Sequence, residues 1–323
     1  MKSLNFAFIC ILLLPLLLLL AGCEKNDNGN DNNENENAAG EITFTAVPNY
    51  PDNTLYFFAT ARQLVVDWGD GSAPETYTNV TMYYMNYREN PYSLISHTYP
   101  AGSTTYTVQI KGEGLTGLSI SRRDIERGGV LTLDVSKCPA LQELLCDNNQ
   151  LTALDVSKCP ALQELDCDNN QLTALDISKC PALGALGCHN NQLTTLNASG
   201  CAVLKELYCS HNQLTTLNVS GCAALYYLHC YNNQLTTLNV SGCAALHSLR
   251  CADNQLTALD ISGCPTLQGL NCYNNQLTAP ALNTVFTALP EYEYGYGTIS
   301  ISNNPGAATC NRSIAQNKRW SVY

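Results

Sequence analysis

The sequence is short of basic residues. Its 323 residues include 16 Lys and Arg against 27 Asp and Glu, which gives a formal net charge of -11. Binding of nucleic acid needs a face rich in Lys and Arg, so we expect no nucleic-acid partner. The sequence also lacks a glycine-rich loop that would cradle phosphates and a clustered set of metal-ligand residues. These absences predict a protein without a cofactor or a metal centre.

Cysteine is abundant, yet the patterns that give cysteine its chemistry are missing. None of the 17 cysteines forms a C-x-x-C pair, and no column of histidines accompanies them, so a zinc site has little support. Fourteen fall into two columns with a spacing of 21 residues, Cys138 to Cys264 and Cys146 to Cys272. They share the phase of neighbouring Leu and Val, which predicts buried, reduced thiols that pack as small hydrophobic groups. Disulfides between coils would have to distort neighbouring strands, and the pairing of Cys310 stays open.

One 21-residue unit is repeated seven times over residues 130–276, and Leu151 to Gln171 (LTALDVSKCPALQELDCDNNQ) is a complete copy. Such a repeat predicts a solenoid in which neighbouring coils share one core. Within the unit, Leu151 to Ser157 is echoed by Leu162 to Asp168, so we expect two short strands and two turns in each coil. Two columns of leucine recur with the period of the repeat: Leu144, Leu165, Leu186, Leu207, Leu228, Leu249 and Leu270, and Leu151, Leu172, Leu193, Leu214, Leu235 and Leu256.

The spacing L-x-x-L-x-C-x-x-N-x-L, seen at Leu141, Leu144, Cys146, Asn149 and Leu151, resembles the leucine-rich repeat with Cys at one Leu position. The resemblance implies parallel strands stacked about 4.8 Å apart. The recurring Asn column is expected to satisfy backbone groups at the turn. The fold class is therefore predicted as mainly β.

The solenoid is expected to cover residues 115–276, because a half-copy (LTGLSIS) at 115–121 precedes the seven repeats. Residues 277–323 break the pattern and predict a C-terminal α/β cap. In this cap the spacing predicts a helix over 280–289, a strand over 298–302 and a last helical stretch that ends near Trp320.

The N-terminus predicts the location of the protein. Residues 1–22 hold an apolar run that ends in Leu20-Ala21-Gly22 before Cys23, and this resembles the lipobox of bacterial lipoprotein signal peptides. It implies that Cys23 becomes the acylated first residue and anchors the protein through its acyl chains; a membrane-spanning segment is the alternative. Residues 23–40 are acidic and rich in Asn, which predicts a disordered tether. By resemblance to surface lipoproteins of Gram-negative bacteria, we expect an outer-membrane protein exposed at the cell surface, with the periplasmic face as the alternative.

Residues 41–114 follow a different pattern. W-G-D-G-S at 68–72 ends an alternating strand, and S-H-T-Y at 96–99 precedes a second strand with the sequence T-Y-T-V. Together these motifs resemble the PKD domain, an immunoglobulin-like β-sandwich common in extracellular proteins. The pattern departs from that family over 74–95, where an insert rich in Tyr predicts either an adhesive loop or an ordered flap.

The candidate binding residues lie in outward columns that flank the buried Leu and Cys of each first strand. The buried columns vary little. In the outward columns, aromatic residues and one Arg are concentrated in the middle and later coils. These are Tyr208, Tyr227, His229, Tyr231, Arg250 and Tyr273. Aromatic and Arg side chains dominate the energetics of protein interfaces, so we expect a non-catalytic face for protein binding or adhesion. A carbohydrate-binding surface component and a structural envelope spacer are the alternatives.

One column contains the chemistry of a hydrolase. Asp168, His189 and Ser210 follow one another in successive coils, in the order of a stacked serine hydrolase triad. We expect this column to face solvent, where the sheet uses the backbone N–H groups and leaves neither an oxyanion hole nor a pocket. The sequence therefore predicts no enzyme.

Overall fold

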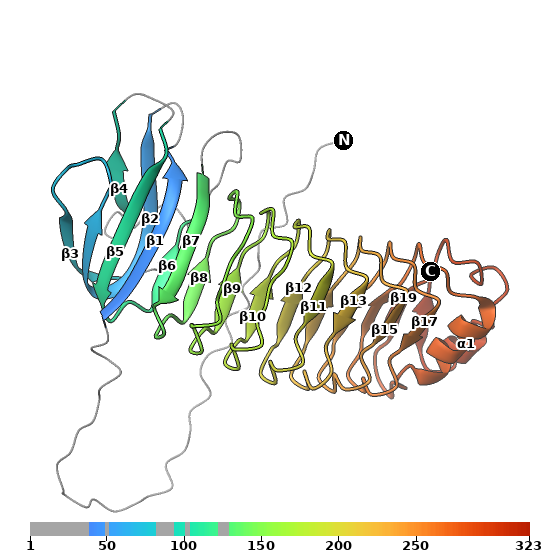
Figure 1. The fold of residues 1–323 in the computed structure, drawn as a ribbon. Helices are drawn as coiled ribbons and strands as arrows, with labels where there is room; N and C mark the ends of the chain where they lie inside the picture. Colours follow the sequence, from blue (N-terminus) through green and yellow to red (C-terminus); the bar gives the residue numbers. More distant parts are fainter. Residues whose placement is uncertain (1–38, 49–51, 82–93, 101–103, 122–128) are drawn as a thin grey trace, which may run out of the picture. The chain divides into compact units, whose positions relative to one another are not determined.

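The computed structural model describes residues 39–48, 52–81, 94–100, 104–121 and 129–323. The predicted signal peptide, Cys23 and nearly all of the predicted tether lie outside the described residues, as do positions 82–93 of the tyrosine-rich insert. The described part is mainly β, as predicted: an antiparallel β region is followed by a solenoid of short parallel strands and a small helical cap (Figure 1). No helix within these ranges is long and apolar enough to cross a bilayer.

The antiparallel region is built from long strands with alternating burial. β1 pairs with β5 and with β7, while β2 pairs with β3, β4 and β5. Every second residue of β1 is buried, including Ile42 and Phe44, which is the period expected when one face of a strand covers a core. The strands are β1 (Ala39–Val47), β2 (Thr54–Asp67), β3 (Glu75–Val80), β4 (Ile95–Thr98), β5 (Tyr106–Glu113) and β7 (Gly129–Lys137).

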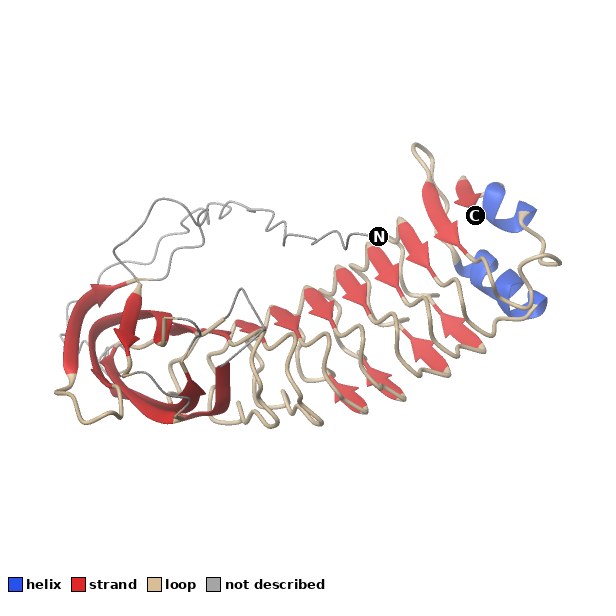
Figure 2. Ribbon diagram, turned by 90° about the horizontal axis from the view of Figure 1, so that it is seen from above, coloured by secondary structure: helices blue, strands red, loops and turns tan. Residues whose placement is uncertain are grey.

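The solenoid has two rows of strands on opposite sides of the stack (Figure 2). In the longer row the strands pair in parallel and in register, so that the leucines form a continuous buried column. This row contains β6 (Gly117–Ser119), β8 (Glu143–Leu145), β9 (Glu164–Asp166), β10 (Ala185–Gly187), β12 (Glu206–Tyr208), β14 (Tyr227–His229), β16 (Ser248–Arg250), β18 (Gly269–Asn271), β19 (Gly297–Ser300) and β20 (Trp320–Val322). The second row contains β11 (Thr195–Asn197), β13 (Thr216–Asn218), β15 (Thr237–Asn239) and β17 (Ala258–Asp260).

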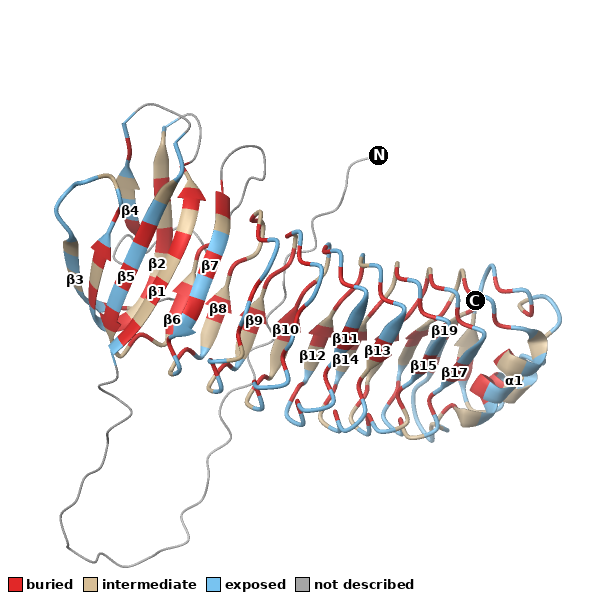
Figure 3. Ribbon diagram, in the orientation of Figure 1, coloured by how far each residue is buried: buried red, intermediate tan, exposed pale blue. Residues whose placement is uncertain are grey.

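The first coil of the solenoid continues directly from the antiparallel region. β6, the strand of the half-copy, pairs antiparallel with β2 on one side and parallel with β8 on the other. The half-copy therefore opens the solenoid as the sequence predicted. The buried residues of both regions form one hydrophobic cluster, and Figure 3 marks buried positions along the strands of both regions. The antiparallel region thus covers the apolar end that a stack of coils would otherwise expose.

The asparagine column is a hydrogen-bond ladder inside the stack. Asn233 is typical: its Oδ1 accepts the Leu214 N–H at 2.9 Å, and its Nδ2 donates to the carbonyls of Cys209 at 3.0 Å and Cys230 at 3.1 Å. The other coils repeat these contacts. Because the turn leaves these backbone groups without a sheet partner, one amide per coil satisfies them. The predicted structural role of the column is confirmed.

Both cysteine columns are buried, and all fourteen thiols are free. The thiols of the first column donate to a carbonyl of the preceding coil, as Cys222 Sγ does to Ala198 O at 3.2 Å and Cys264 Sγ to Val240 O at 3.2 Å. Burial raises the pKa of the Cys222 thiol to about 12, so the thiol stays protonated and unreactive at neutral pH. The predicted burial of both cysteine columns is confirmed.

The cap follows the prediction in part. Helix α1 (Ala279–Ala288) begins after the N-cap Thr278 and buries Leu282, Val285 and Phe286 on the last coils. β19 lies where a strand was predicted. The last stretch is different, because α2 (Ser313–Gln316) is only one turn long and Trp320 begins the additional strand β20. The ring of Trp320 lies over Gly297, where a Cβ would stand 2.4 Å from it, so this contact fixes the final strand.

Candidate binding face on the parallel strands

Four of the six predicted binding residues lie on three neighbouring strands, and Tyr231 and Tyr273 follow the strands of their coils. Tyr208 ends β12, Tyr227 and His229 belong to β14, and Arg250 ends β16. Register places Glu206 beside Tyr227, and places Tyr208, His229 and Arg250 in one row across the sheet. Each of these residues flanks a buried Leu, so its side chain stands on the outer face.

Four aromatic side chains of this group contact one another. The rings of Tyr208 and His229 meet edge to face with centroids 4.9 Å apart, and the centroids of Tyr227 and Tyr231 each lie 6.5 Å from His229. The Tyr208 hydroxyl donates to the Glu206 carboxylate at 2.9 Å. His229 is therefore the centre of the group. We call these four residues together with Arg250 the aromatic patch.

Tyr273 does not join the aromatic patch. It stands two coils beyond Tyr231 in the same column, and Ala252 occupies the coil between them. Among the described residues no ring contact connects Tyr273 with the aromatic patch.

Sequence reasoning missed three further rings beside the aromatic patch. Tyr226 stacks on His247 with centroids 4.7 Å apart and an interplanar angle of 5°, and it meets Tyr227 edge to face. His211 contacts Tyr231 with centroids 5.1 Å apart. The exposed ring of Tyr226 and its partner His247 lie just before the strands, one residue outside the columns that alternation predicts.

Of Tyr226, His247 and His211, the last departs most clearly from the repeat. It adopts a left-handed backbone conformation with φ of 53°, at the position where the other six coils have Asn or Asp. Asn, Asp and His all tolerate this conformation better than most residues. The departure from the repeat at this position therefore keeps the turn and adds a ring beside Tyr231. Comparison of the repeats with one another would have revealed this position.

Arg250 is the only charged residue of the aromatic patch at pH 7. Burial, and then the charge of Arg250, lower the pKa of His229 to about 4. Burial and the nearby His189 also lower the pKa of His211. Both imidazoles are therefore neutral at pH 7. Between residues 185 and 276 the only Lys or Arg residues are Lys205 and Arg250.

The opposite end of the same face is acidic. Glu143 and Glu164 are neighbours in register on β8 and β9, and Asp166 ends β9 beside Asp168. Burial and the charge of Glu164 raise the pKa of Glu143 to about 7, and burial with the charges of Asp168 and Asp147 raises the pKa of Asp166. Gly187 leaves space here, because a Cβ at this position would lie 3.0 Å from Asp166 Oδ1.

The pKa of Glu143 predicts a pH dependence of stability. Between the ordinary pKa of 4.5 and about 7, the unfolded chain loses the Glu143 proton while the folded chain keeps it, so this group lowers stability as pH rises through that window. Glu143→Gln removes the effect. We expect the melting temperature of the variant, relative to the wild type, to increase from pH 4.5 to pH 7.5 in thermal unfolding followed by circular dichroism. An unchanged difference across this range would contradict the assignment, and Glu291→Gln at an exposed position is the control.

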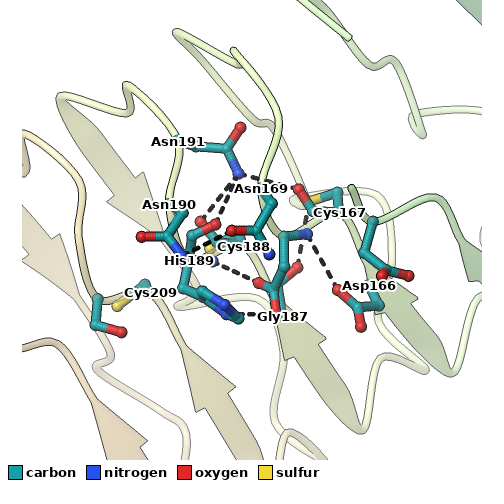
Figure 4. Close-up of polar contacts among 12 residues, drawn as sticks. Asp166, Cys167, Asn169, Gly187, Cys188, His189, Asn190, Asn191 and Cys209 are labelled. Carbon is teal, nitrogen blue, oxygen red and sulfur yellow. Dashed lines mark hydrogen bonds and ion pairs between the residues drawn. The ribbon is translucent and has the colours of Figure 1, made fainter. Parts of the chain in front are cut away.

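The sequence predicts that the column of Asp168, His189 and Ser210 faces solvent, but two of the three residues are buried and His189 is only partly exposed. Asp168 is 2 % exposed and Ser210 is 3 % exposed, because the chain turns inward directly after the three-residue strand and the alternation ends there. Asp168 accepts the His189 backbone N–H at 2.5 Å and its other oxygen contacts Nδ1 of the same residue (Figure 4). Within the described residues no hydrogen bond joins His189 to Ser210, so the triad is not assembled.

Metal binding has no geometric support in the part of the chain that the structure describes. No group of three or more His, Cys, Asp or Glu residues is arranged there to hold an ion. The face therefore offers rings, one guanidinium and carboxylates on a regular sheet, which are groups suited to recognition of a partner surface.

Comparison with known proteins agrees with this geometry. Residues 139–179 match the family model of leucine-rich repeats in two copies, while no curated protein matches the chain. The functional domain of InlJ from Listeria monocytogenes, which includes a cysteine ladder, is 34% identical over 65% of this chain with a TM-score of 0.55. This chain covers 43% of that InlJ chain, less than half of its length.

Two further solved structures are similar. The leucine-rich repeat domain of APL1B is 20% identical, with 57% of this chain and 55% of that chain covered and a TM-score of 0.50. YopM from Yersinia enterocolitica is 26% identical, with 52% and 34% covered and a TM-score of 0.42. From the family match, the InlJ comparison and the stacked coils together, the solenoid is a leucine-rich-repeat domain built from 21-residue repeats.

Proposed function

We propose that the protein is a non-catalytic binding protein that recognises a protein partner with the aromatic patch. The observation that carries this proposal is the distribution of departures from the repeat. The buried columns are nearly uniform, whereas Tyr208, Tyr227 and His229 stand at outward positions where the other coils have Leu, Arg, or small or polar residues. A core needs none of these rings, because coils with Ser, Ala or Asn at these positions stack equally well.

The physical basis of recognition is a rigid surface. The strands below the aromatic patch are held by in-register pairing and by the asparagine ladder, so little conformational entropy is lost when a partner binds. Tyr and Arg supply large contact areas and hydrogen bonds, as in the centres of other protein interfaces. A carbohydrate ligand is the second candidate, because the exposed ring of Tyr226 stacked on His247 offers a flat platform.

The test replaces the rings with residues that the repeat itself tolerates. Tyr208→Asn and His229→Asn copy Asn271, and Tyr227→Ser copies Ser248, each in the same column. We expect the triple variant to lose at least tenfold in partner affinity, since central aromatic residues each contribute roughly 1 to 2 kcal/mol or more. The measurement is binding of the wild type and the variant to protein and glycan arrays and to a partner recovered from them.

The matched control changes the opposite row of strands. Thr195→Ala, Thr216→Ala and Thr237→Ala alter three exposed residues at a position where Ala258 stands in another coil. This control is expected to bind as the wild type does. An equal loss of partner affinity in both triple variants would contradict the proposed site. Binding signals confined to the glycan array would favour the carbohydrate ligand. The absence of a signal in both arrays would favour a structural spacer.

We also propose that the protein is a lipoprotein anchored at the bacterial outer membrane through acyl chains on Cys23, with the PKD-like β-sandwich and the solenoid exposed at the cell surface. The support is the lipobox-like sequence Leu20-Ala21-Gly22 before this cysteine and the acidic stretch after it. Metabolic labelling with a fatty-acid analogue is expected to mark the wild type and to leave Cys23→Ala unlabelled. Labelling of the variant at the wild-type level would exclude Cys23 as the acylated residue.

A further inference from the structure

The C-terminal cap carries a loop that is anchored at its base and exposed at its tip. Residues 291–296, which we call the cap loop, connect α1 to β19. The Tyr292 hydroxyl donates to the Leu267 carbonyl and its ring packs 5.9 Å from Trp320, whose indole N–H donates to Pro290 O at 2.8 Å. Gly295 has φ of 83°, which lets the tip turn. The cap loop is therefore held in one place on the last coils.

The tip of the cap loop displays apolar and acidic groups to solvent. Tyr294 is 82 % exposed and Tyr296 is 77 % exposed, more than any other large hydrophobic side chain in the described part of the chain. Glu291 and Glu293 are also exposed, and no ion pair among the described residues involves them. Large exposed rings on a fixed loop are typical of an interaction site.

The cationic complement of the cap loop lies on the same sheet. Lys205 and Arg250 are both exposed, and no ion pair within the described residues engages either cation. Lys205 is next to Tyr226, whose backbone N–H donates to the Lys205 carbonyl at 2.8 Å and whose ring is exposed, while Arg250 ends β16 in register with His229. They are the only Lys or Arg residues between positions 185 and 276 of an acidic chain. Two exposed cations on one face, one of them beside the ring of Tyr226, thus match two exposed carboxylates beside two rings.

The cap loop lies at the same edge of the sheet as Lys205 and Tyr226, a short distance away, and Arg250 stands at the far end of the three-residue strand β16. The cap loop leads into the start of β19, and Lys205 and Tyr226 directly precede the starts of β12 and β14. β19 is three strands beyond β14 in the sheet order, which corresponds to roughly 15 Å at about 4.8 Å per strand. Consider a twofold axis that is perpendicular to the stack and lies midway between the cap loop and the cationic residues. This axis places the cap loop of each copy against the cationic residues of the other copy. Such an arrangement makes two identical contacts and closes on itself.

We propose that the protein forms a twofold dimer in which the cap loop of each copy lies against Lys205, Tyr226 and Arg250 of the other. Glu291 and Glu293 face the two cations, and Tyr294 and Tyr296 pack on the ring of Tyr226. This self-association goes beyond the proposed recognition of a partner, and it shares Arg250 with the aromatic patch. Dimer formation and partner binding therefore compete for the same face.

The test uses charge reversal on both sides of the contact. Lys205→Glu with Arg250→Glu gives a patch variant, and Glu291→Lys with Glu293→Lys gives a loop variant. In each variant alone, like charges meet, so we expect the dimer dissociation constant of the full chain to rise at least roughly tenfold in sedimentation equilibrium. When the two variants are mixed in equal amounts, both contacts join opposite charges again and a heterodimer is expected.

The control reverses two exposed lysines away from the contact. Lys158→Glu with Lys179→Glu changes the net charge as the patch variant does, and it is expected to dimerise as the wild type does. Circular dichroism melts of all variants check that the fold is kept. A wild type that is monomeric at every concentration, a mixture that stays monomeric, or a control that loses the dimer would each overturn the proposal. Capture of the partner is measured on the same proteins. This measurement distinguishes a failure of the dimer proposal from a failure of the proposed partner binding.

Discussion

Asn233→Ala is expected to lower the free energy of unfolding by about 3 to 5 kcal/mol. The side chain is 8 % exposed and bonds four backbone groups: Leu214 N–H and the carbonyls of Cys209, Cys230 and Tyr231. Alanine would leave these groups in a space that water does not reach. Each buried polar group without a partner costs about 1 to 3 kcal/mol, so the sum is large even after local relaxation.

Urea unfolding of purified protein measures this effect. The control is Gln234→Ala, because this neighbouring side chain is exposed and its backbone N–H keeps the bond to Leu214 O at 2.9 Å. We expect the control to change stability by less than about 0.5 kcal/mol. A loss below about 1 kcal/mol in Asn233→Ala would show that the ladder is dispensable to the stack.

Leu228→Ala is expected to destabilise the protein by about 3 to 4 kcal/mol. Leu228 is the central residue of β14, it is fully buried, and it stacks in register between Leu207 and Leu249. Truncation removes apolar contacts on both sides and leaves a cavity, because the coils above and below are fixed by their own hydrogen bonds. A coil in the middle of the stack also couples its two neighbours, so its loss weakens both halves.

The matched control for this change is Val203→Ala. Val203 is 48 % exposed in the same solenoid, and its truncation is expected to change the free energy of unfolding by less than about 0.5 kcal/mol. Both variants are compared in the same denaturant titration, in which the slope also reports cooperativity. If Leu228→Ala unfolds at the wild-type midpoint, the leucine column does not form the shared core.

The proposed partner binding and the two stability predictions depend on different positions within a coil. Leu228 and Asn233 face inward and repeat almost without change, whereas Tyr227 and His229 face outward and depart from the repeat. Each coil thus separates stability from recognition by the alternation of its strand. Variants of the outward residues should leave stability nearly unchanged, which makes binding defects interpretable.

The solenoid could be predicted from the repeat alone. A period of 21 residues places like side chains above one another in every coil, so Leu144, Cys146 and Asn149 each predict a whole column from one example. The half-copy at 115–121 and helix α1 were predictable for the same reason, because both carry a local pattern of apolar residues. The outward positions of Tyr208, Tyr227 and His229 followed from simple alternation about a buried Leu.

The positions beyond the end of each local pattern could not be predicted, because packing between coils sets them. Asp168 and Ser210 are buried because the chain turns inward after a strand of three residues, and no periodicity extends past that turn. β20 forms because Trp320 packs over Gly297, a contact between residues that share no repeat. The ring contacts of Tyr226 and His211 likewise depend on distances between coils, and side-chain directions at strand ends are set by packing rather than by period.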